Sequence, residues 1–581
     1  MKLNKALLSS LAVSTFALST FTFSAFTFST GMFVLSSPLA ASTSELDLGY
    51  TSHASNYLIG RSAARLNDYK IGAQFYGRAF EDNPQDQILL ERAFVLYVTS
   101  GNFERSLEMA KTIVVKHPSH QLARFVLGLD ETKNKRYAAA RKHFELAASN
   151  RIGELTASVL LAWTYAGQGN TKAAYKALDR LDAQGNLNKF KQVHKALVAD
   201  YLKDSKTAEK SFLEADSGAG NSLQFANAYG SFLWRKGDTI KARAVFTNYI
   251  NNKEHNPIIK VQLAALNAGK PAPTLIATPS DGMFEVLFAL AGALSDKQNA
   301  NVALIYGQLS LFLKPKSSLA YILLGETYQG IKQYSNAIEA FKKVDPQSPL
   351  ASNVDIQIAS NLDDIDKTKE ALKRLNSLIA REPQNFNAWS TKGSILYGRE
   401  KWDEAAEALS LALARIKEKK RQHWAVYYYR GMSFERAGKW DRAEPDLQMA
   451  LKLRPAQPAV LNYLGYSWID RGENLEKAME MVKQAADLRP RDGYIIDSVG
   501  WAHFRLGQYE EAVKRLEQAV RLLPGDPTVN DHLGDAYWRV GRKLEAGFQW
   551  AHARDLKPTK KALVNILEKI KTGLKDKPNK S

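Results

Sequence analysis

The C-terminal part of the chain contains two consecutive segments with one pattern. They read DSVGWAHFRLGQYEEAVKRLEQAVRLLP at residues 497–524 and DHLGDAYWRVGRKLEAGFQWAHARDLKP at residues 531–558. Two glycines, an alanine and a final proline hold the same relative places in both. Small residues let two helices cross closely, glycine allows the left-handed backbone that ends a helix, and proline stops the following turn. The segments therefore predict a repeated pair of helices.

The pattern continues towards the N-terminus, at first clearly and then more loosely. The repeated glycine of the first helix is Gly465 and Gly431 in the two preceding units, and Gly325 in another clear unit. In the N-terminal half the units stay in phase, because Pro84 and Pro118 are separated by the same 34 residues as Pro524 and Pro558. A fixed period of this length indicates a repeat array rather than a set of globular domains.

The spaced residues resemble those of the tetratricopeptide repeat (TPR) superfamily. About twelve to fourteen units of this length fit between residues 50 and 558. The resemblance implies an all-α fold, a right-handed superhelical solenoid of about twelve to fourteen TPR helix pairs in two arrays. Pro271, Pro273 and Pro279 cannot lie in one continuous helix, so the two arrays are expected to meet there.

Five parts are expected along the chain. They are a signal peptide (1–41), an N-terminal TPR-like array (43–265), a Pro/Gly linker (266–282), a C-terminal TPR array (283–558), and a capping helix with a basic tail (559–581). The apolar residues of the last part have helical spacing, and its lysines are interpreted as the solvated side of the capping helix.

The first residues have the character of a leader. Lys2 and Lys5 are followed by a long stretch of Leu, Phe, Ala, Ser and Thr, and cleavage is expected after Ala40, Ala41 or Ser42. Export to the periplasm follows from this interpretation. The stretch is also long enough to act as an uncleaved membrane anchor, which is the alternative localisation.

Composition narrows the possible chemistry. The 581 residues include 79 Lys and Arg against 60 Asp and Glu, a formal net charge of +19, and no cysteine. The charge admits nucleic acid, anionic membrane or acidic ligands as partners, and export argues against nucleic acid. The missing cysteine excludes disulfides, thiolate catalysis, cysteine-ligated metals and a lipid anchor on an N-terminal cysteine.

The sequence favours a protein that is not an enzyme. It has no glycine-rich phosphate loop, no nucleophile elbow and no HExxH motif. His117 and His120 are the only close pair of histidines, and two ligands without a third do not make a metal site. His503 stands where other units have an aromatic core residue. We therefore expect no catalytic residue, no metal and no cofactor.

The first helix of each pair is expected to line a concave face. The residues three before, one after and five after the repeated glycine should point into it. Aromatic rings interleaved with Arg, Asn and Asp suit an extended peptide, whereas four aspartates would repel a terminal carboxylate. The predicted partner-binding residues are Tyr428, Met432, Arg436, Asn462, Tyr466, Asp470, Asp497, Trp501, Arg505, Asp531, Asp535 and Arg539.

The run from residue 460 to 541 also resembles a group of exported bacterial TPR adaptor proteins, which includes the partner of a periplasmic carboxy-terminal processing protease. This resemblance implies a non-catalytic scaffold that binds a protein or extended peptide and delivers cell-wall hydrolases or other envelope enzymes to a periplasmic protease. The chain departs from that lipoprotein group because it lacks the lipidated cysteine. An accessory role in the export or assembly of an anionic polysaccharide is the alternative, and membrane contact is expected to be peripheral at most.

Overall fold

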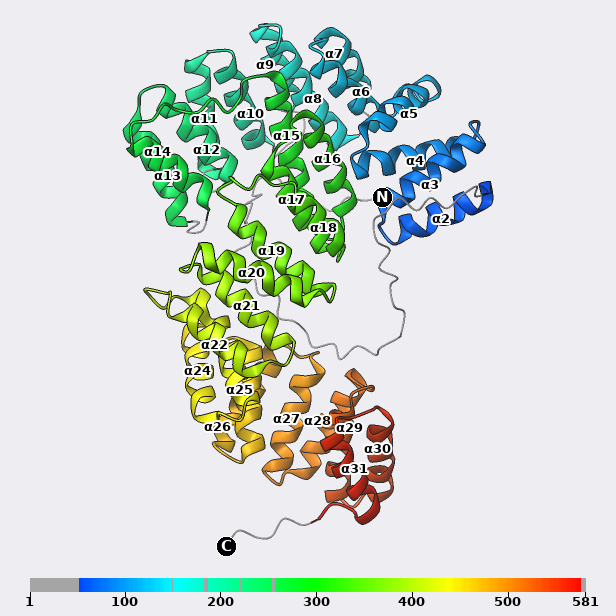
Figure 1. Cartoon of the computed structure of the whole chain (residues 1–581), viewed down its shortest axis with the longest axis vertical. Helices are drawn as coiled ribbons and strands as arrows, with labels where there is room; N and C mark the ends of the chain where they lie inside the picture. The colour runs from blue at the N-terminus through cyan, green and yellow to red at the C-terminus, as the bar shows by residue number, and fades with distance from the viewer. Residues whose placement is uncertain (1–51, 149, 182–186, 220–221, 253–255, 576–581) are drawn as a thin grey trace. The chain divides into compact units, whose positions relative to one another are not determined.

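The computed structural model describes residues 52–575 except 149, 182–186, 220–221 and 253–255, and this part of the chain is helical without a strand. The expected signal peptide lies outside the described residues. An all-α fold is confirmed. The chain forms two compact units, unit 1 up to Arg374 and unit 2 from Leu375 (Figure 1).

Unit 1 consists of antiparallel helix pairs that follow one another along the chain. Its helices are α2 (His53–Arg65), α3 (Tyr69–Asp82), α4 (Gln87–Ser100), α5 (Phe103–Lys116), α6 (Gln121–Lys133), α7 (Tyr137–Leu146), α8 (Arg151–Ala166), α9 (Thr171–Asp179), α10 (Asn188–Tyr201), α11 (Ser205–Ala219), α12 (Leu223–Arg235), α13 (Thr239–Asn252), α14 (Pro257–Asn267), α15 (Pro279–Ala293), α16 (Ala300–Leu313), α17 (Ser318–Gly330), α18 (Tyr334–Phe341) and α19 (Ala351–Asp364).

Unit 2 continues the same pairing, and α20 (Thr368–Arg381) spans the division between the units. Its further elements are α21 (Phe386–Gly398), α22 (Trp402–Leu413), the short 3-10 helix η2 (Arg421–His423), α23 (Trp424–Arg436), α24 (Trp440–Leu453), α25 (Pro458–Arg471), α26 (Leu475–Leu488), α27 (Gly493–Arg505), α28 (Tyr509–Leu522), α29 (Pro527–Arg539), α30 (Lys543–Asp555) and α31 (Lys560–Thr572).

The repeated glycines are needed because a large side chain of the second helix lies against each of them. A Cβ atom at Gly534 would lie 2.5 Å from the indole of Trp550, and one at Gly500 would lie 2.6 Å from Cγ of Leu516. Trp550 and Leu516 are almost fully buried at these crossings. The predicted helix pairing is thus confirmed by the contacts that it required.

The ends of the helices follow their local sequence. Asp526 caps α29 by accepting hydrogen bonds from the backbone N–H groups of Thr528 and Val529, and Pro527 occupies the first turn. Gly541 follows α29 with φ +83°, in the left-handed region that glycine adopts without strain. These signals place the short loops between the paired helices.

The proline-rich segment lies inside unit 1. The backbone is non-helical between Asn267, where α14 ends, and Pro279, where α15 begins under a capping box made by Thr278 and Asp281. Arg235 holds the segment by donating a hydrogen bond of 2.6 Å to the carbonyl of Pro273. The boundary between compact units therefore does not coincide with the expected linker at 266–282, since the helices that follow it pack back onto the first array.

Helices α15 and α16 cover the inner side of the first array. Contacts join α15 to α6, α8 and α10, and α16 to α4 and α6, all of which are first helices of their pairs. Figure 1 shows α15 and α16 on the inner side of the row of helices that runs from α4 to α12. The concave face expected in this part of the chain is thus occupied by the chain itself.

Apolar and polar contacts both fix this arrangement. Phe312 of α16 packs on Phe103 with ring centroids 4.4 Å apart, and the ammonium of Lys133 lies 3.9 Å from the centroid of the Phe312 ring. The hydroxyls of Thr156 and Tyr306 are 3.2 Å apart in a buried hydrogen bond. These residues are far apart in sequence, so they form a tertiary core instead of a stack of neighbours.

Burial of Glu326 makes the stability of unit 1 depend on pH. It raises the pKa of Glu326 from 4.5 to about 7, so the folded state disfavours the charged form and loses stability as the pH rises from about 4.5 to about 7. We expect Glu326→Gln to remove this loss. The stability of the variant minus that of the parent should therefore be about 3 kcal/mol larger at pH 8 than at pH 4.5. Urea unfolding of unit 1 followed by hydrogen exchange at the two pH values measures it. An equal difference at both pH values would contradict the expectation.

Candidate functional site

The predicted partner-binding residues lie on four first helices of unit 2, namely α23, α25, α27 and α29. Contacts join α25 to α27 and α27 to α29, so successive first helices lie next to one another. The repeat therefore places residues of equal register in rows along one side of the unit. Their accessibility differs strongly along these rows.

The predicted residues of α23, the first of these four helices, stand among a group of aromatic rings. Tyr428 stacks on Trp424 with centroids 6.1 Å apart and meets Tyr463 edge-on at 5.8 Å. Burial raises the pKa of Tyr428 above its ordinary value, so the phenol stays neutral. Met432 is only 5% exposed and receives the hydroxyl of Tyr397 at 3.5 Å from its sulfur. Met432 therefore belongs to the core and does not line an open face.

The middle of the row combines a half-buried ring with charges of both signs. Burial raises the pKa of Tyr466, and the carboxylates of Asp497 and Asp470 raise it further. Arg436 and Arg505 act on the same phenol in the opposite direction. The Tyr466 hydroxyl is therefore a neutral donor with positive and negative groups around it, which is an environment suited to a polar backbone.

Asn462 contributes an acceptor beside this ring. Its Oδ1 is buried, and within the described chain no donor reaches it. A buried amide oxygen without a partner is costly, so a donor supplied from outside the chain would be bound favourably. Nε1 of Trp501, on the next first helix, is likewise buried without an acceptor in the described chain.

Arg505 and Asp470 are engaged with each other. The guanidinium of Arg505 donates a 2.8 Å hydrogen bond to the backbone carbonyl of Asp470 and lies 4.0 Å from its carboxylate. The Arg505 side chain is 15% exposed, whereas that of Asp470 is 66% exposed. Arg505 thus secures the C-terminal end of α25, and Asp470 remains accessible.

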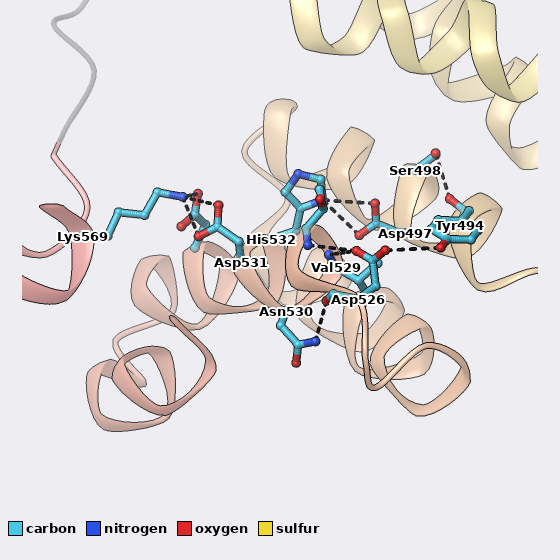
Figure 2. A network of polar contacts seen from close by, with 11 residues as sticks. Tyr494, Asp497, Ser498, Asp526, Val529, Asn530, Asp531, His532 and Lys569 are labelled. Atoms are coloured by element: carbon cyan, nitrogen blue, oxygen red, sulfur yellow. Dashed lines mark hydrogen bonds and ion pairs between the residues drawn. The ribbon is translucent and has the colours of Figure 1, made fainter. Parts of the chain in front are cut away.

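A buried ion pair and a stack of rings join α27 to α29. Nδ1 of His532 lies 3.0 Å from Oδ1 of Asp497, and both side chains are buried (Figure 2). The His532 ring stacks on Trp501 at 4.0 Å, and Trp501 stacks on Phe504 at 4.7 Å. Burial lowers the pKa of His532, but the carboxylates around it, Asp497 first, outweigh burial, so the net change is a rise. Asp497 and Trp501 therefore bind the chain's own rings.

The last predicted residues are covered by the C-terminal helix. The Lys569 ammonium of α31 lies 2.8 Å from carboxylate oxygens of both Asp531 and Asp535 (Figure 2). Asp535 also accepts a 2.9 Å hydrogen bond from Nε1 of Trp550, and Arg539 donates one of 3.0 Å to the carbonyl of Lys575. The capping helix thus takes up Asp531 and Asp535, and the segment that follows it takes up Arg539. Lys569 lies on the inner side of the helix, not on its solvated side.

Of the predicted residues, Arg436 and Asp470 are exposed, Met432, Asp497 and Asp535 are buried, and the others are partly exposed. Among the partly exposed ones, Trp501, Arg505, Asp531 and Arg539 are engaged by other parts of the chain, which leaves Tyr428, Asn462 and Tyr466 beside the two exposed charges. The interpretation of the sequence missed Lys569 as the partner of Asp531 and Asp535. Continuing the period of 34 residues would have identified it, because Lys569 follows by one residue the place where the next repeated glycine would stand.

The described part of the chain holds no group of three or more His, Asp or Glu side chains arranged for a metal ion. His120 caps α6 by accepting from the N–H of Ala123, and Nε2 of His117 lies 2.9 Å from Oε1 of Gln87. His503 is buried, with Nδ1 2.6 Å from Oε1 of Gln508. Among the described helices, none is both long and apolar enough to cross a membrane.

The repeat is shown by comparison with known families. Models of the tetratricopeptide repeat match residues 91–154, 357–419 and 428–493, another matches 319–345, and a TPR repeat model matches 500–541. Together with the helix pairing, these matches identify the chain as a tetratricopeptide repeat protein, with repeats in both compact units.

Individual relatives are distant. The chain is 25% identical over 190 residues to TPR repeat-containing protein PA4667 of Pseudomonas aeruginosa, a stretch that covers 32% of this chain and 31% of that protein. The chain thus spans about a third of the length of that curated relative. Solved structures with similarity include the Cut9–Hcn1 hetero-tetramer of APC/C (14% identity, TM-score 0.39, 90% of this chain and 97% of that one) and yeast Tom70 (15% identity, TM-score 0.30, 90% and 95%). YrrB, described as a TPR protein with an unusual peptide-binding site, is 19% identical with TM-score 0.28, over 32% of this chain and 94% of that one.

Proposed function

We propose that the protein is an exported, non-catalytic scaffold that binds an extended segment of a partner protein along the first helices of unit 2. The single observation that carries this proposal is the buried, unpartnered Oδ1 of Asn462 beside the neutral hydroxyl of Tyr466. A peptide backbone offers an N–H donor and a carbonyl acceptor in alternation, and these two groups match them.

Unit 2 is preferred over unit 1 because the inner side of unit 1 is occupied. Helices α15 and α16 lie on its first helices α4, α6, α8 and α10. The corresponding residues of α23 and α25 carry no such cover from within the described part of unit 2, and Arg436 and Asp470 remain exposed there. A partner with both basic and acidic side chains suits this pair of charges.

The expected leader and the resemblance of residues 460–541 to exported adaptors support a partner class. We infer that this protein acts in the periplasm and that its partners are envelope or cell-wall enzymes, which it brings to a protease of the same compartment. The apolar stretch after Lys5 and the expected cleavage near Ala41 support export. Asp470, the exposed carboxylate of the row, supports a protein partner over an anionic polysaccharide, which it would repel.

A crosslinking experiment tests the proposal directly. Tyr466 is replaced by a photoreactive residue in cells, and Lys477, which is exposed on the second helix α26, is replaced in the same way as the control. We expect one abundant envelope protein crosslinked from position 466 and not from position 477. Crosslinks of equal yield from both positions, or none from position 466, would refute the binding face, and a cytoplasmic partner would refute export.

The contribution of the unpartnered amide is a separate prediction. We expect Asn462→Ala to weaken binding of the crosslinked partner about tenfold, since one hydrogen bond in a buried site contributes about 1–1.5 kcal/mol. Gln448→Ala, on the outer side of α24, is the matched control and should leave affinity unchanged. Titration calorimetry with the two purified proteins measures both, and equal affinity of the Asn462→Ala variant and the parent would contradict the assignment.

A further inference from the structure

The outer side of α30 differs from that of the preceding second helices of unit 2. In those helices the residues two before and two after the buried alanine are exposed and mostly charged, and in α30 they are Leu544, 72% exposed, and Phe548, 66% exposed. The corresponding pairs in α22, α24, α26 and α28 are Asp403 and Glu407, Asp441 and Pro445, Glu476 and Glu480, and Glu510 and Lys514.

Helix α31 begins a further repeat and exposes the face on which a second helix would pack. The residues four and one before the repeated glycine are buried in the earlier first helices, as Leu461 and Leu464 of α25 show with 4% and 1% exposure. One period after α29 the same places hold Val564, 65% exposed, and Leu567, 46% exposed. Ile566, 1% exposed, anchors the helix to unit 2. The apolar face of α31 is therefore unpartnered within the described chain.

The charge around this face is positive. Lys560, Lys561 and Lys571 are exposed, and within the described residues no ion pair involves them. Glu568, the only carboxylate of α31, forms an ion pair with Lys575. Seven lysines and two acidic residues stand between residues 560 and 580, counted in the sequence. An apolar stripe bordered by lysines on a short amphipathic helix is the pattern of a helix that lies in a membrane interface.

We propose that the C-terminal end of the protein, made of α30 and α31, docks on the surface of an anionic phospholipid bilayer. The lysines meet the negative headgroups, and Leu544, Phe548, Val564 and Leu567 enter the boundary between headgroups and acyl chains. A helix that completed the last repeat would cover Val564 and Leu567 but would leave Leu544 and Phe548 in water. A second copy would bring two sets of unpaired lysines together. A bilayer accommodates apolar residues from both helices together with the positive charge.

This surface is distinct from the peptide-binding row, and docking would leave Asn462 and Tyr466 unaffected. Its role goes beyond the proposed scaffold function, because it would confine a protein without a lipidated cysteine to a membrane surface. It does not require any helix to span the bilayer.

The absence of cysteine allows a local test on the full chain. Val564→Cys is labelled with an environment-sensitive dye, and Ile240→Cys, 82% exposed on α13, is labelled as the control. With vesicles of phosphatidylglycerol and phosphatidylcholine we expect a blue shift from position 564 only. The apparent affinity for vesicles, measured by this shift, should be about tenfold or more lower with pure phosphatidylcholine or in 0.5 M salt. Both labelled variants carry the same N-terminal apolar stretch. Binding through that stretch therefore cannot produce a difference in shift between positions 564 and 240.

Variants separate the contribution of the lysine charges from that of the apolar side chains. Lys560→Glu with Lys561→Glu should weaken vesicle binding of the 564 probe more than tenfold, at about fivefold for each lysine lost. Lys417→Glu with Lys419→Glu makes the same change of net charge elsewhere on unit 2 and should have no effect. Leu544→Ser with Phe548→Ser should also weaken binding, whereas Leu488→Ser on α26 should not.

Three results would overturn the proposal. The first is no shift from position 564 with anionic vesicles, and the second is an equal shift from positions 564 and 240. The third is a shift that appears without vesicles and grows with protein concentration, which would assign the face to a second copy of the chain.

Discussion

Replacing Lys569 by Met should detach α31 from unit 2. The ammonium of Lys569 is held between the carboxylates of Asp531 and Asp535, of which Asp535 is only 4% exposed. Removing the cation leaves the buried Asp535 beside the partly buried Asp531 without a counter-charge, and loss of one partner from such a site costs about 3–5 kcal/mol. Hydrogen exchange should show protection lost throughout α31 and in the last turns of α29.

Two further variants make this prediction specific. Lys575→Met removes an ion pair with Glu568 whose partners are 74% and 52% exposed, so it should change stability by less than about 1 kcal/mol. Adding Asp531→Asn and Asp535→Asn to Lys569→Met should restore most of the protection, because neutral amides carry no uncompensated charge. Full protection of α31 in the Lys569→Met variant alone would show that the buried pair does not hold the helix.

Replacing Trp163 by Ala should have a comparable effect in unit 1. Trp163 is fully buried, and a Cβ atom at Gly282 would lie 2.1 Å from its ring, so the backbone of α15 rests on the indole. Truncation removes this surface and leaves a cavity between α8 and α15, at a cost of about 3–5 kcal/mol. Hydrogen exchange in α8 and α15 should rise together.

The matched control is Trp389→Ala in unit 2. Trp389 is partly exposed and has Arg415 at 4.8 Å from its ring centroid, an arrangement worth about 1 kcal/mol. The Trp389→Ala substitution should leave hydrogen exchange in α8 and α15 unchanged. If Trp163→Ala lowers the stability of unit 1 by less than about 1 kcal/mol, the contact with α15 does not hold the inner side of the array.

The repeat could be predicted because each of its determinants is local. The close approach of Gly534 to Trp550 and of Gly500 to Leu516 joins residues sixteen positions apart, and a period makes such pairs visible in a single chain. The left-handed glycine at 541 and the proline after α30 are equally local.

The accessibility of the candidate site could not be predicted in this way. Asp497 stands in the same register as Asn462, yet it is buried because His532 of the following repeat covers it, while Asn462 has no such partner. The packing of α16 on α8 likewise leaves no periodic signal, since Thr156 of α8 and Tyr306 of α16 meet across 150 residues of sequence. Register fixes the direction of a side chain, and the identity of distant neighbours decides whether it reaches solvent.

The occupied inner side of unit 1 has a consequence for how the protein folds. Repeat arrays usually have low contact order and can unfold from their ends one unit at a time. In unit 1 the hydroxyl of Tyr69 instead hydrogen-bonds Asn301 at 2.6 Å, across 232 residues of sequence. The first repeats therefore lack part of their core until α15 and α16 have been synthesised. Unit 1 should consequently fold slowly and melt as one cooperative block, whereas unit 2 should fray progressively from α31.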